Sequence, residues 1–304
     1  MREAVGLAER VSSTDANVLI VGESGAGKDL LAAFIHSRSK RSLEPFVKID
    51  CATLPGALLE AELFGYERGA FTGAVTTKAG RFEAADKGTL VLDEIAHLST
   101  DAQAKLLRVI ERREFERLGG RKTMRLDLRL IALSNVNLEE AVKTGRFRED
   151  LFYRLNVISI PVPALRERKD DLLQLIQHFL KHYSAKHGRN VQRLTPAARA
   201  VLSAYDYPGN ARELANIIER AVIVATGKKL DEEDLPSGLQ AAVSAQQRQE
   251  RPLSLAEMEA AYIAEMLAAT GGNKAECARI LGISRKNLYE KIARYKLATN
   301  SRVV

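Results

Sequence analysis

The chain of 304 residues contains only two cysteines and no long apolar run. Its longest apolar stretch falls well short of the roughly 18 residues that a membrane-spanning helix requires. Cys51 and Cys277 are far apart and lack metal-ligand spacing, which favours reduced thiols over a disulfide framework. The residues after Met1 follow a mixed helical pattern instead of the apolar core of a signal peptide. These absences predict a cytoplasmic protein that has no membrane partner.

The composition is that of an ordinary globular protein. The hydrophobic fraction is 46% and the charged fraction is 28%, values typical of chains that fold around apolar cores. A length of 304 residues is sufficient for two or three domains. The net charge of +7 and the pI near 9.3 mildly favour an anionic partner, although charge alone does not identify one.

A phosphate-binding loop is predicted directly after the apolar run Val18–Val21, which is typical of a buried strand. A helical pattern follows the loop. In this context the backbone N–H groups and the helix N-terminus face the phosphates, and a lysine reaches the β- and γ-phosphate oxygens. Asp29 stands where the general pattern has Ser or Thr for Mg²⁺. The predicted nucleotide-binding residues are Gly22, Glu23, Ser24, Gly25, Ala26, Gly27, Lys28 and Asp29.

Carboxylates follow two further predicted strands. Strand 46–49 leads to Asp50, and strand 89–92 leads to Asp93 and Glu94. In an open parallel sheet such positions lie beside the phosphate loop. We therefore expect Asp93 to hold Mg²⁺, directly or through water, and Glu94 to orient and polarise the attacking water.

A helix N-cap is the weaker interpretation of the Asp93–Glu94 pair. The next helix, predicted from about Asp101 to Glu114, has its own start signal in residues 99–101. A fourth strand then ends in Ser134 and Asn135. This polar pair could contact the γ-phosphate or hold the water, but by itself it is not specific.

The segment Gly69–Ala74, with the sequence Gly-Ala-Phe-Thr-Gly-Ala, lies between the phosphate loop and the Asp93–Glu94 pair. Two glycines make it a poor helix and a good loop tip. One interpretation is a tight turn that places Phe71 in the core. The other is a loop that presents Phe71 to a partner, because an exposed aromatic residue is otherwise a solubility liability.

Several arginines are concentrated in the segment from Gly145 to Asn156. Such a cluster is usually a solvated helix face. In a ring-shaped ATPase, Arg148 and Arg154 could instead project into a neighbouring subunit's nucleotide site, where an arginine contributes about 10³–10⁵ in rate. Residues 161–163, Pro-Val-Pro, are predicted to break regular structure.

Helical periodicity dominates from Asp170 to Ala225. The last helix of this region starts near residues 208–210 and carries Arg212 in its first turn. A cation there is unfavourable for the helix dipole unless an anion lies nearby, which fits a nucleotide phosphate. Residues 237–252 are rich in Ala, Gln and Ser and are predicted to be a linker.

The tail is predicted to be a helix-turn-helix domain. A helix from Leu253 is followed by two short helices around a turn at Gly282–Ile283, and Ser284 caps the last one. Residues 252–304 hold eight lysines and arginines against five glutamates. A structural three-helix bundle is the alternative, but a recognition helix in the DNA major groove is favoured. The predicted DNA-contacting residues are Ser284, Arg285, Lys286, Asn287, Tyr289 and Lys291.

These motifs together resemble the sigma-54-dependent transcriptional activators, or bacterial enhancer-binding proteins, of the AAA+ superfamily, over nearly the whole chain. Residues 69–74 match the family's GAFTGA loop letter for letter, and residues 22–29 are similar to its GESGTGKE. Residues 147–154 resemble its arginine-finger segment, residues 208–214 its sensor II motif, and the tail its Fis-type DNA-binding domain.

The resemblance implies an α/β fold in which an AAA+ P-loop domain, with a three-layer α/β/α parallel sheet, precedes an all-α lid and a helix-turn-helix domain. The expected divisions are residues 1–163, 164–236, a linker 237–252 and 253–304. It also implies that ATP, with Mg²⁺, is hydrolysed in a homo-oligomer, commonly a hexameric ring and a dimer when inactive. Hydrolysis would drive the GAFTGA loops against sigma-54 RNA polymerase holoenzyme at a promoter, while the tail binds enhancer DNA.

The resemblance also assigns roles to individual residues. The sigma-54 contacts would be Gly69, Ala70, Phe71, Thr72, Gly73 and Ala74. Arg148 and Arg154 would act in trans, Arg212 in cis, and Asn135 near the γ-phosphate. Asp50 departs from the family, which often has Asn there to hold the Walker B glutamate inactive, and two nearby carboxylates would repel or share a proton.

Three smaller departures accompany Asp50. Tyr207 stands where the family usually has Trp, which indicates a packing change, and Ser134 replaces Thr while keeping the hydroxyl. Family ATPase domains begin several residues before the position that corresponds to Met1, and some of those residues contact adenine, so a truncated gene or a wrongly assigned start is one expectation. Two other functions stay open. A repressor with the ATPase fold would be expected to lose the GAFTGA residues, and a clamp loader or unfoldase would have neither the loop nor the Fis-like tail.

Overall fold

A computed structural model describes residues 1–239 and 254–295 of the chain. Residues 1–239 and residues 240–304 form two compact units, and each is considered by itself. The predicted linker residues 240–252 and the predicted helix start at Leu253 lie outside the described residues. Within the described ranges, no helix combines the length and apolarity needed to span a membrane.

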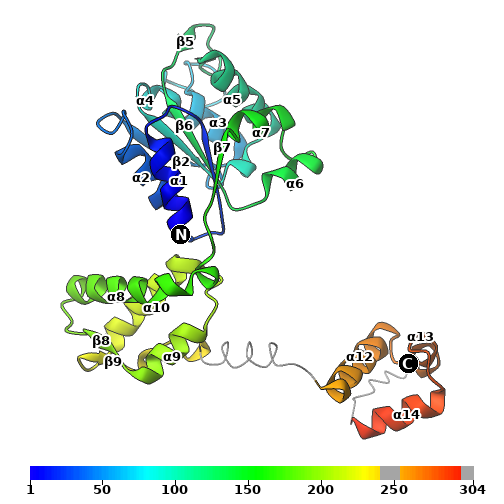
Figure 1. The fold of residues 1–304 in the computed structure, drawn as a ribbon. Coiled ribbons are helices and arrows are strands. Elements are labelled where there is room, and N and C mark those ends of the chain that lie inside the picture. Colours follow the sequence, from blue (N-terminus) through cyan, green and yellow to red (C-terminus); the bar gives the residue numbers. More distant parts are fainter. Residues whose placement is uncertain (240–253, 296–304) are drawn as a thin grey trace. The chain divides into compact units, whose positions relative to one another are not determined.

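A parallel five-stranded sheet with the order β2-β3-β6-β1-β7 forms the centre of the first unit (Figure 1). Four of its strands were predicted, and β7 was missed because proline is rare in strands. Pro161 occupies its last position. The strands are β1 (Val18–Val21), β2 (Phe46–Asp50), β3 (Thr89–Asp93), β6 (Arg129–Ser134) and β7 (Ile158–Pro161).

Apolar side chains of the sheet alternate between two separate cores. In β3, Leu90 and Leu92 pack on one face and Val91 on the other, as the two-residue strand period requires. Helices cover both faces, which confirms the predicted three-layer α/β/α fold. One face carries α1 (Arg2–Ser12) and α2 (Lys28–Ser37). The other carries α3 (Gly56–Phe64), α4 (Arg81–Ala84), α5 (Thr100–Arg112), α6 (Leu138–Lys143) and α7 (Glu149–Leu155).

An antiparallel hairpin of β4 (Glu114–Glu116) and β5 (Thr123–Arg125) follows α5. The helix predicted to reach Glu114 therefore ends at Arg112. Arg113 takes a left-handed conformation with φ 58° and turns the chain into the hairpin. A short 3-10 turn, η1 (Ile95–His97), lies between β3 and α5.

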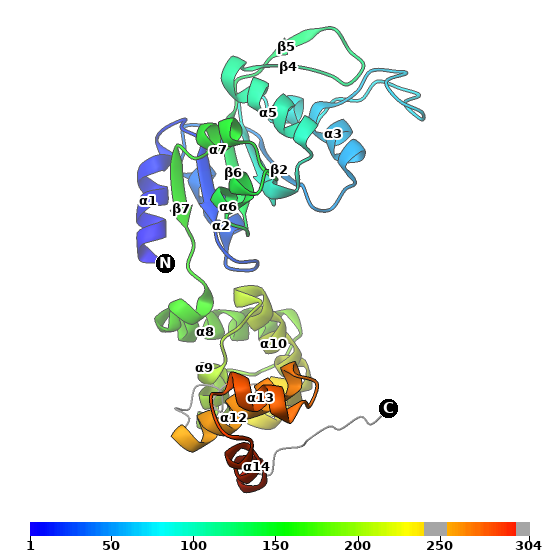
Figure 2. The ribbon, with the colours of Figure 1, turned by 90° about the vertical axis from the view of Figure 1, so that its right-hand side faces the viewer.

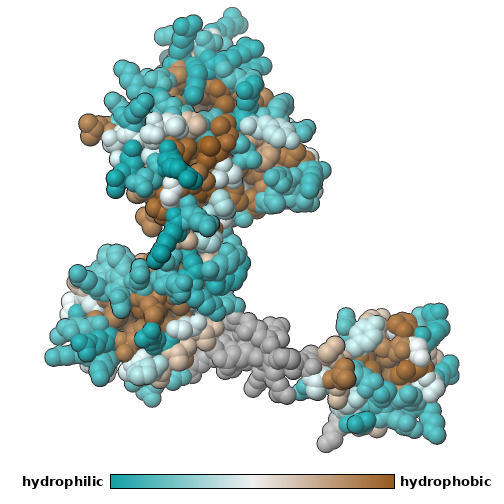
Figure 3. Space-filling model, viewed as in Figure 1, coloured by the Kyte–Doolittle hydropathy of each residue, from teal (hydrophilic) through white to brown (hydrophobic). Residues whose placement is uncertain are grey.

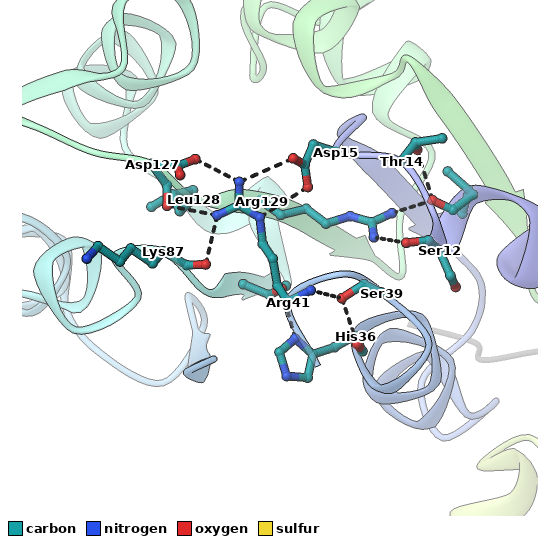
Figure 4. A network of polar contacts seen from close by, with 12 residues as sticks. Ser12, Thr14, Asp15, His36, Ser39, Arg41, Lys87, Asp127, Leu128 and Arg129 are labelled. Carbon is teal, nitrogen blue, oxygen red and sulfur yellow. Dashed lines mark hydrogen bonds and ion pairs between the residues drawn. The ribbon is translucent and has the colours of Figure 1, made fainter. Parts of the chain in front are cut away.

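A network of two arginines ties together the end of the sheet where the strands begin (Figure 4). Arg129 is fully buried and donates to the carbonyl oxygens of Val11 (2.9 Å) and Ser12 (3.0 Å) at the C-terminus of α1. Burial lowers the pKa of Arg129, but a cation at a helix C-terminus is favoured by the helix dipole. Arg41 pairs with Asp15 and Asp127. These contacts fix α1 to the end of the sheet where the strands begin. Asp50 and Asp93 lie at the other end, where the strands finish.

The lid is mainly helical, as predicted. Its helices are α8 (Lys169–Lys186), α9 (Pro196–Ala204) and α10 (Asn210–Val224), with short turns η2 (Leu165–Glu167) and η3 (Glu232–Asp234). Two short strands that the sequence did not suggest, β8 (Arg193–Leu194) and β9 (Lys229–Leu230), pair in parallel. Leu239 is buried in the lid core, so the lid continues beyond the predicted boundary at residue 236. Tyr207 is buried there too, and its hydroxyl donates to the carbonyl oxygen of Leu202.

Within residues 254–295 the second unit has three helices, α12 (Leu255–Ala269), α13 (Lys274–Ile280) and α14 (Arg285–Arg294). Side-chain caps at Ser254, Asn273 and Ser284 start them, each by accepting hydrogen bonds from N–H groups of the first turn. A small core forms from Ile263, Leu267, Cys277, Ala278 and Leu288. The predicted helix-turn-helix arrangement is confirmed.

Candidate functional site

The phosphate loop connects β1 to α2 and is shaped by glycines in the left-handed region. Gly25 has φ 74° and Gly27 has φ 106°, conformations that side-chain-bearing residues rarely adopt. Lys28 is buried, and its ammonium group donates to the carbonyl oxygens of Gly22 (2.7 Å) and Glu23 (3.2 Å). Burial lowers the pKa of Lys28, and the nearby carboxylates of Glu94 and Asp93 partly offset that effect.

Asp50 and Asp93 are register partners at the carboxyl ends of the neighbouring strands β2 and β3. The predicted carboxylates therefore do meet at one edge of the sheet. Asp50 accepts a hydrogen bond from the N–H of Ala52 (2.8 Å), so one of its oxygens is engaged in the turn that follows β2. The backbone N–H of Cys51 donates to the carbonyl oxygen of Asp93 (2.9 Å) and fixes the two strand ends to each other.

Glu94 follows β3 in a left-handed conformation with φ 52°. Its Oε2 atom is buried and has no hydrogen-bond partner in the described part of the chain. Burial raises the pKa of this carboxyl group, and the neighbouring Asp93 adds to the rise against the opposing effect of Lys28. A desolvated carboxylate with a free acceptor is suited to polarise a water molecule.

Lys48, which sequence reasoning missed, joins two of the predicted site residues. Its ammonium group contacts the carboxylates of Asp29 and Asp93, at 2.8 Å from Oδ2 of Asp93. Both ion pairs raise the pKa of Lys48 against the lowering effect of its burial. A charged residue in the otherwise apolar stretch of β2, two positions before Asp50 and hence on the same face, was the available signal.

The donor set beside the phosphate loop fits a magnesium ion that is shared with a nucleotide. Mg²⁺ prefers oxygen ligands and is usually held by one or two carboxylates together with substrate phosphates. Asp29 and Asp93 supply such carboxylates, and the cation that already bridges them is the ammonium group of Lys48. Across residues 1–239 and 254–295, no cluster of three or more His, Cys, Asp or Glu forms an all-protein metal cage.

Ser134 and Asn135 lie at the end of β6, next to β1. The Ser134 hydroxyl donates to the carbonyl oxygen of Val136 (2.7 Å), and the Ser134 carbonyl accepts from the N–H of Gly22 (3.1 Å). Ser134 thus fixes the start of the phosphate loop. The backbone of Asn135 interacts with Glu94, which places Asn135 beside that carboxylate.

The lid contacts the phosphate loop through several hydrogen bonds. Arg212, predicted to lie near a phosphate, donates to Oγ of Ser24 (3.0 Å). The N–H of Ala211 donates to the carbonyl oxygen of Gly25 (3.1 Å). Contact is so close that a Cβ atom on Gly25 would lie 2.4 Å from the carbonyl oxygen of Gly209.

Three lid residues that were not predicted to be site residues hold the same loop. Arg166 forms a two-pronged ion pair with the carboxylate of Glu23. Arg168 donates to the carbonyl oxygen of Ala26 (2.6 Å). Asn210 donates to Glu23 as well, and these contacts, Arg166 first and Asn210 second, lower the pKa of Glu23 to about 2. Glu23 is therefore part of the joint between core and lid.

Arg148 is the N-cap residue of α7 and is half-buried, whereas Arg154 lies in the last turn of α7 and is exposed. Arg148 pairs with Asp150 (2.8 Å) and Arg154 with Glu111 (3.2 Å), so within one chain neither is drawn into the phosphate loop. Hydrophobic residues gather on this face of the core around β7 (Figure 3). Tyr153 and Val157 are 67% and 57% exposed, which is the character of a surface that contacts another protein.

The Gly69–Ala74 loop is part of an insertion between α3 and α4 that lies beside the β4–β5 hairpin (Figure 2). Gly69 and Gly73, with φ 83° and 106°, form its bends. Phe71 is 41% exposed and packs edge-on against Tyr66, with ring centroids 5.0 Å apart. Ala74 is buried instead. The interpretation in which Phe71 enters the core is therefore wrong.

The base of this loop is fixed by backbone hydrogen bonds. Tyr66 and Lys78 exchange two bonds of 2.9 Å across the insertion. The carbonyl of Leu118, from the hairpin, accepts from the N–H of Glu67 (3.0 Å). A Cβ atom on Gly119 would lie 2.8 Å from the side chain of Ala70, so hairpin and loop are in close contact.

In α14, Arg285, Lys286 and Asn287 are exposed in the first turn. Tyr289 is exposed as well and lies under the ammonium group of Lys274, 5.2 Å from the ring centroid. Lys291, the remaining basic residue of the predicted DNA-contacting set, is engaged within the domain. It forms an ion pair of 2.6 Å with Glu259 on α12, and its side chain is only 21% exposed, so it contributes to the packing of the domain.

Comparison with known proteins covers each part of the chain. Residues 1–161 match the Sigma-54 interaction domain, residues 166–252 the AAA+ ATPase lid domain, and residues 254–295 the bacterial regulatory proteins of the Fis family.

Several individual proteins are similar over almost the whole chain. The regulatory protein AtoC of Escherichia coli is 46% identical over 94% of this chain and 64% of its own length. The nitrogen fixation protein AnfA of Azotobacter vinelandii is 45% identical over 99% of this chain and 57% of its own length. The chain thus spans less than two thirds of these relatives. A crystal structure of NtrX from Brucella abortus in complex with ATP has a TM-score of 0.74 and 35% identity, over 97% of this chain and 68% of that one.

The three family matches agree with the parallel-sheet fold, the phosphate loop, the helical lid and the helix-turn-helix tail. The protein is a member of the sigma-54-dependent transcriptional activators, a family built on an AAA+ ATPase domain.

Proposed function

We propose that this protein hydrolyses ATP to remodel the sigma-54 RNA polymerase holoenzyme while its tail binds enhancer DNA. The observation that carries the proposal is the half-exposed side chain of Phe71 on the intact Gly69–Ala74 loop. In the same domain, β2 and β3 bring Asp50, Asp93 and Glu94 together at one edge of the sheet. An aromatic residue held at a loop tip by backbone hydrogen bonds is suited to press on a partner protein.

The nucleotide chemistry follows from the groups around the phosphate loop. Lys28 and the loop N–H groups would bind the phosphates, and Asp93, with Asp29 beside it, would hold Mg²⁺. The ion would neutralise charge on the phosphates. Glu94, with its unpartnered buried oxygen, would take the position of the group that orients water. Arg212 reaches the loop from the lid of the same chain.

A continuous stretch of chain connects the nucleotide site to the loop. Asp50 ends β2, α3 follows six residues later, and the insertion begins at Gly65 where α3 ends. A shift of Glu94 relative to the ends of β2 and β3 would therefore move α3 and the base of the loop. Phe71 leaves or regains its contact with Tyr66 in that motion, which changes how much of its ring is available.

We infer that a second subunit completes the site. Arg154 is exposed and Arg148 is half-buried, and both lie close in the chain to the exposed Tyr153 and Val157. An assembly that buries this surface would bring both arginines to a neighbour's nucleotide, in a ring such as a hexamer. The separate helix-turn-helix unit presents Arg285 and Lys286 at the N-terminus of α14 for DNA.

The test separates ATP hydrolysis from the formation of open promoter complexes. Thr72 is exposed at the loop tip and far in sequence from the phosphate loop, so Thr72→Ala should leave ATP hydrolysis within about twofold of wild type, since exposed substitutions are usually near neutral. Formation of open promoter complexes with sigma-54 holoenzyme should be lost. Lys28→Ala, the control, should abolish both. If Thr72→Ala and Phe71→Ala both retain open-complex formation, the loop is not the contact.

A further inference from the structure

The core side of the phosphate loop carries more carboxylates than ammonium groups, whereas the lid brings Arg166, Arg168 and Arg212 to the loop from its other side. Lys28 interacts with Glu94, Asp93 and Asp29, and the carboxylates of Asp50, Asp93 and Glu94 also act on the thiol of Cys51. A nucleotide adds further negative charge to this region. Carboxylates close to phosphates repel them unless a cation lies between. The groups concerned are the carboxylates of Asp29, Asp50, Asp93 and Glu94 and the ammonium groups of Lys28 and Lys48.

Lys48 supplies the cation between two of these carboxylates. Its ammonium group contacts Asp29 on the phosphate loop side and Oδ2 of Asp93 at the end of β3. The Asp93 side chain is 14% exposed and that of Lys48 37%, so the contact with Asp93 is partly shielded from water. A partly shielded pair is worth more than a surface pair.

We infer that Lys48 is a built-in counter-ion that occupies the magnesium position and competes with Mg²⁺ for Asp93. This inference rests on the proposed nucleotide site. Two cations held at one carboxylate oxygen repel each other, so Mg²⁺ bound at Oδ2 of Asp93 would displace the ammonium group from it. The flexible stem of lysine permits that movement while the contact with Asp29 is kept. Lys48 is thus a positioning residue that lets the site accept nucleotide before the metal arrives.

The substitution Lys48→Met removes the charge and keeps the length of the side chain. Without metal, ADP affinity should fall about three- to tenfold, because two carboxylates then face the phosphates unneutralised. The Mg²⁺ concentration that gives half-maximal ADP binding should fall by a similar factor, because the competitor is gone. Lys48→Arg keeps the charge and should retain the metal-free affinity.

The experiment is calorimetric titration of the full chain with ADP, in EDTA and at increasing MgCl₂. Lys186→Met is the matched control, since Lys186 forms an ion pair with Glu219 in the lid. It should behave as wild type. Circular dichroism melts verify that each variant is folded.

Two results would overturn the inference. If Lys48→Met has the metal-free affinity and the Mg²⁺ midpoint of wild type, the lysine is not a counter-ion. If its affinity falls equally with and without Mg²⁺, Lys48 is a direct phosphate ligand instead. A wild-type chain that binds no ADP under either condition would refute the nucleotide site itself, and hence the proposed function.

Discussion

Asn210 offers the sharpest test of how the lid holds the phosphate loop. Its side chain is fully buried, and its backbone lies in the left-handed region with φ 53°. The Oδ1 atom accepts from the N–H of Leu165 (2.7 Å), while Nδ2 donates to the carbonyl of Ser24 and to the carboxylate of Glu23, both at 3.0 Å. Asn210→Ala removes all three bonds and retains a strained backbone.

The expected loss can be worked from these contacts. Leaving the buried N–H of Leu165 without an acceptor costs about 1–3 kcal/mol, and each of the two donated bonds contributes about 0.5–1.5 kcal/mol. A left-handed conformation costs alanine about 1 kcal/mol more than glycine. Asn210→Ala should therefore reduce the free energy of unfolding of residues 1–239 by about 3–7 kcal/mol, and Asn210→Gly by about 1 kcal/mol less.

Both losses can be measured by urea unfolding of the full chain. Circular dichroism at about 222 nm reports the helical content during unfolding. Nucleotide affinity should weaken in both variants, since the loop loses the same two contacts in each. Arg199→Ala on the exposed side of α9 is a suitable control. Equal stabilities for the alanine and glycine variants would refute the strain argument. Losses below about 0.5 kcal/mol in both would refute the hydrogen-bond argument.

Three further predictions concern charge. The double substitution Arg285→Ala and Lys286→Ala should weaken DNA binding, measured by fluorescence anisotropy. It should also reduce the slope of log affinity against log salt concentration by about 2. An unchanged slope would contradict a recognition helix. Because the pKa of Glu23 is lowered to about 2, its contribution to stability is present above its unfolded value and lost as pH falls toward about 2. The difference in Tm between wild type and Glu23→Gln should therefore shrink from about pH 5 to pH 3, and a constant difference would exclude the pair as the cause. Arg129→Met should destabilise the core by about 1–3 kcal/mol in urea unfolding through the orphaned carbonyl of α1, whereas the exposed Arg125→Met should change it by less than about 0.5 kcal/mol.

Much of the fold could be predicted because its signals are local. The run Val18–Val21 and the glycine-rich loop after it are encoded in consecutive residues, and the cap at Ser284 follows from one side chain and the N–H groups beside it. β7 escaped prediction because Pro161 argues against a strand, yet it ends an edge strand where its missing N–H costs little. The left-handed Arg113, which ends α5 early, likewise has no local signature.

The residues of the candidate site could likewise be predicted only in part from local sequence. Residue type and order along the chain are enough to mark Lys28, Asp93 and Glu94 for phosphate chemistry, because that chemistry needs a lysine after a glycine loop and acids at strand ends. They are also enough to mark Gly69–Ala74 as a loop. Which partner each group meets depends on strand register and on the docking of the lid. Only the tertiary structure decides that, because it brings together residues far apart in sequence.

Lys48 and Asn210 show this most clearly. By itself a lysine in a strand is ambiguous, and it becomes a counter-ion only because β2 pairs beside β3 and brings it to Asp93. Asn210 lies 187 positions after Glu23, and the lid places it on that carboxylate. The sequence alone determined four of the five strands of the central sheet, the motifs and the family, since these depend on short-range patterns. The tertiary structure decided the ion pairs and the strained positions, since an electrostatic contact depends on distance in space and not on distance along the chain.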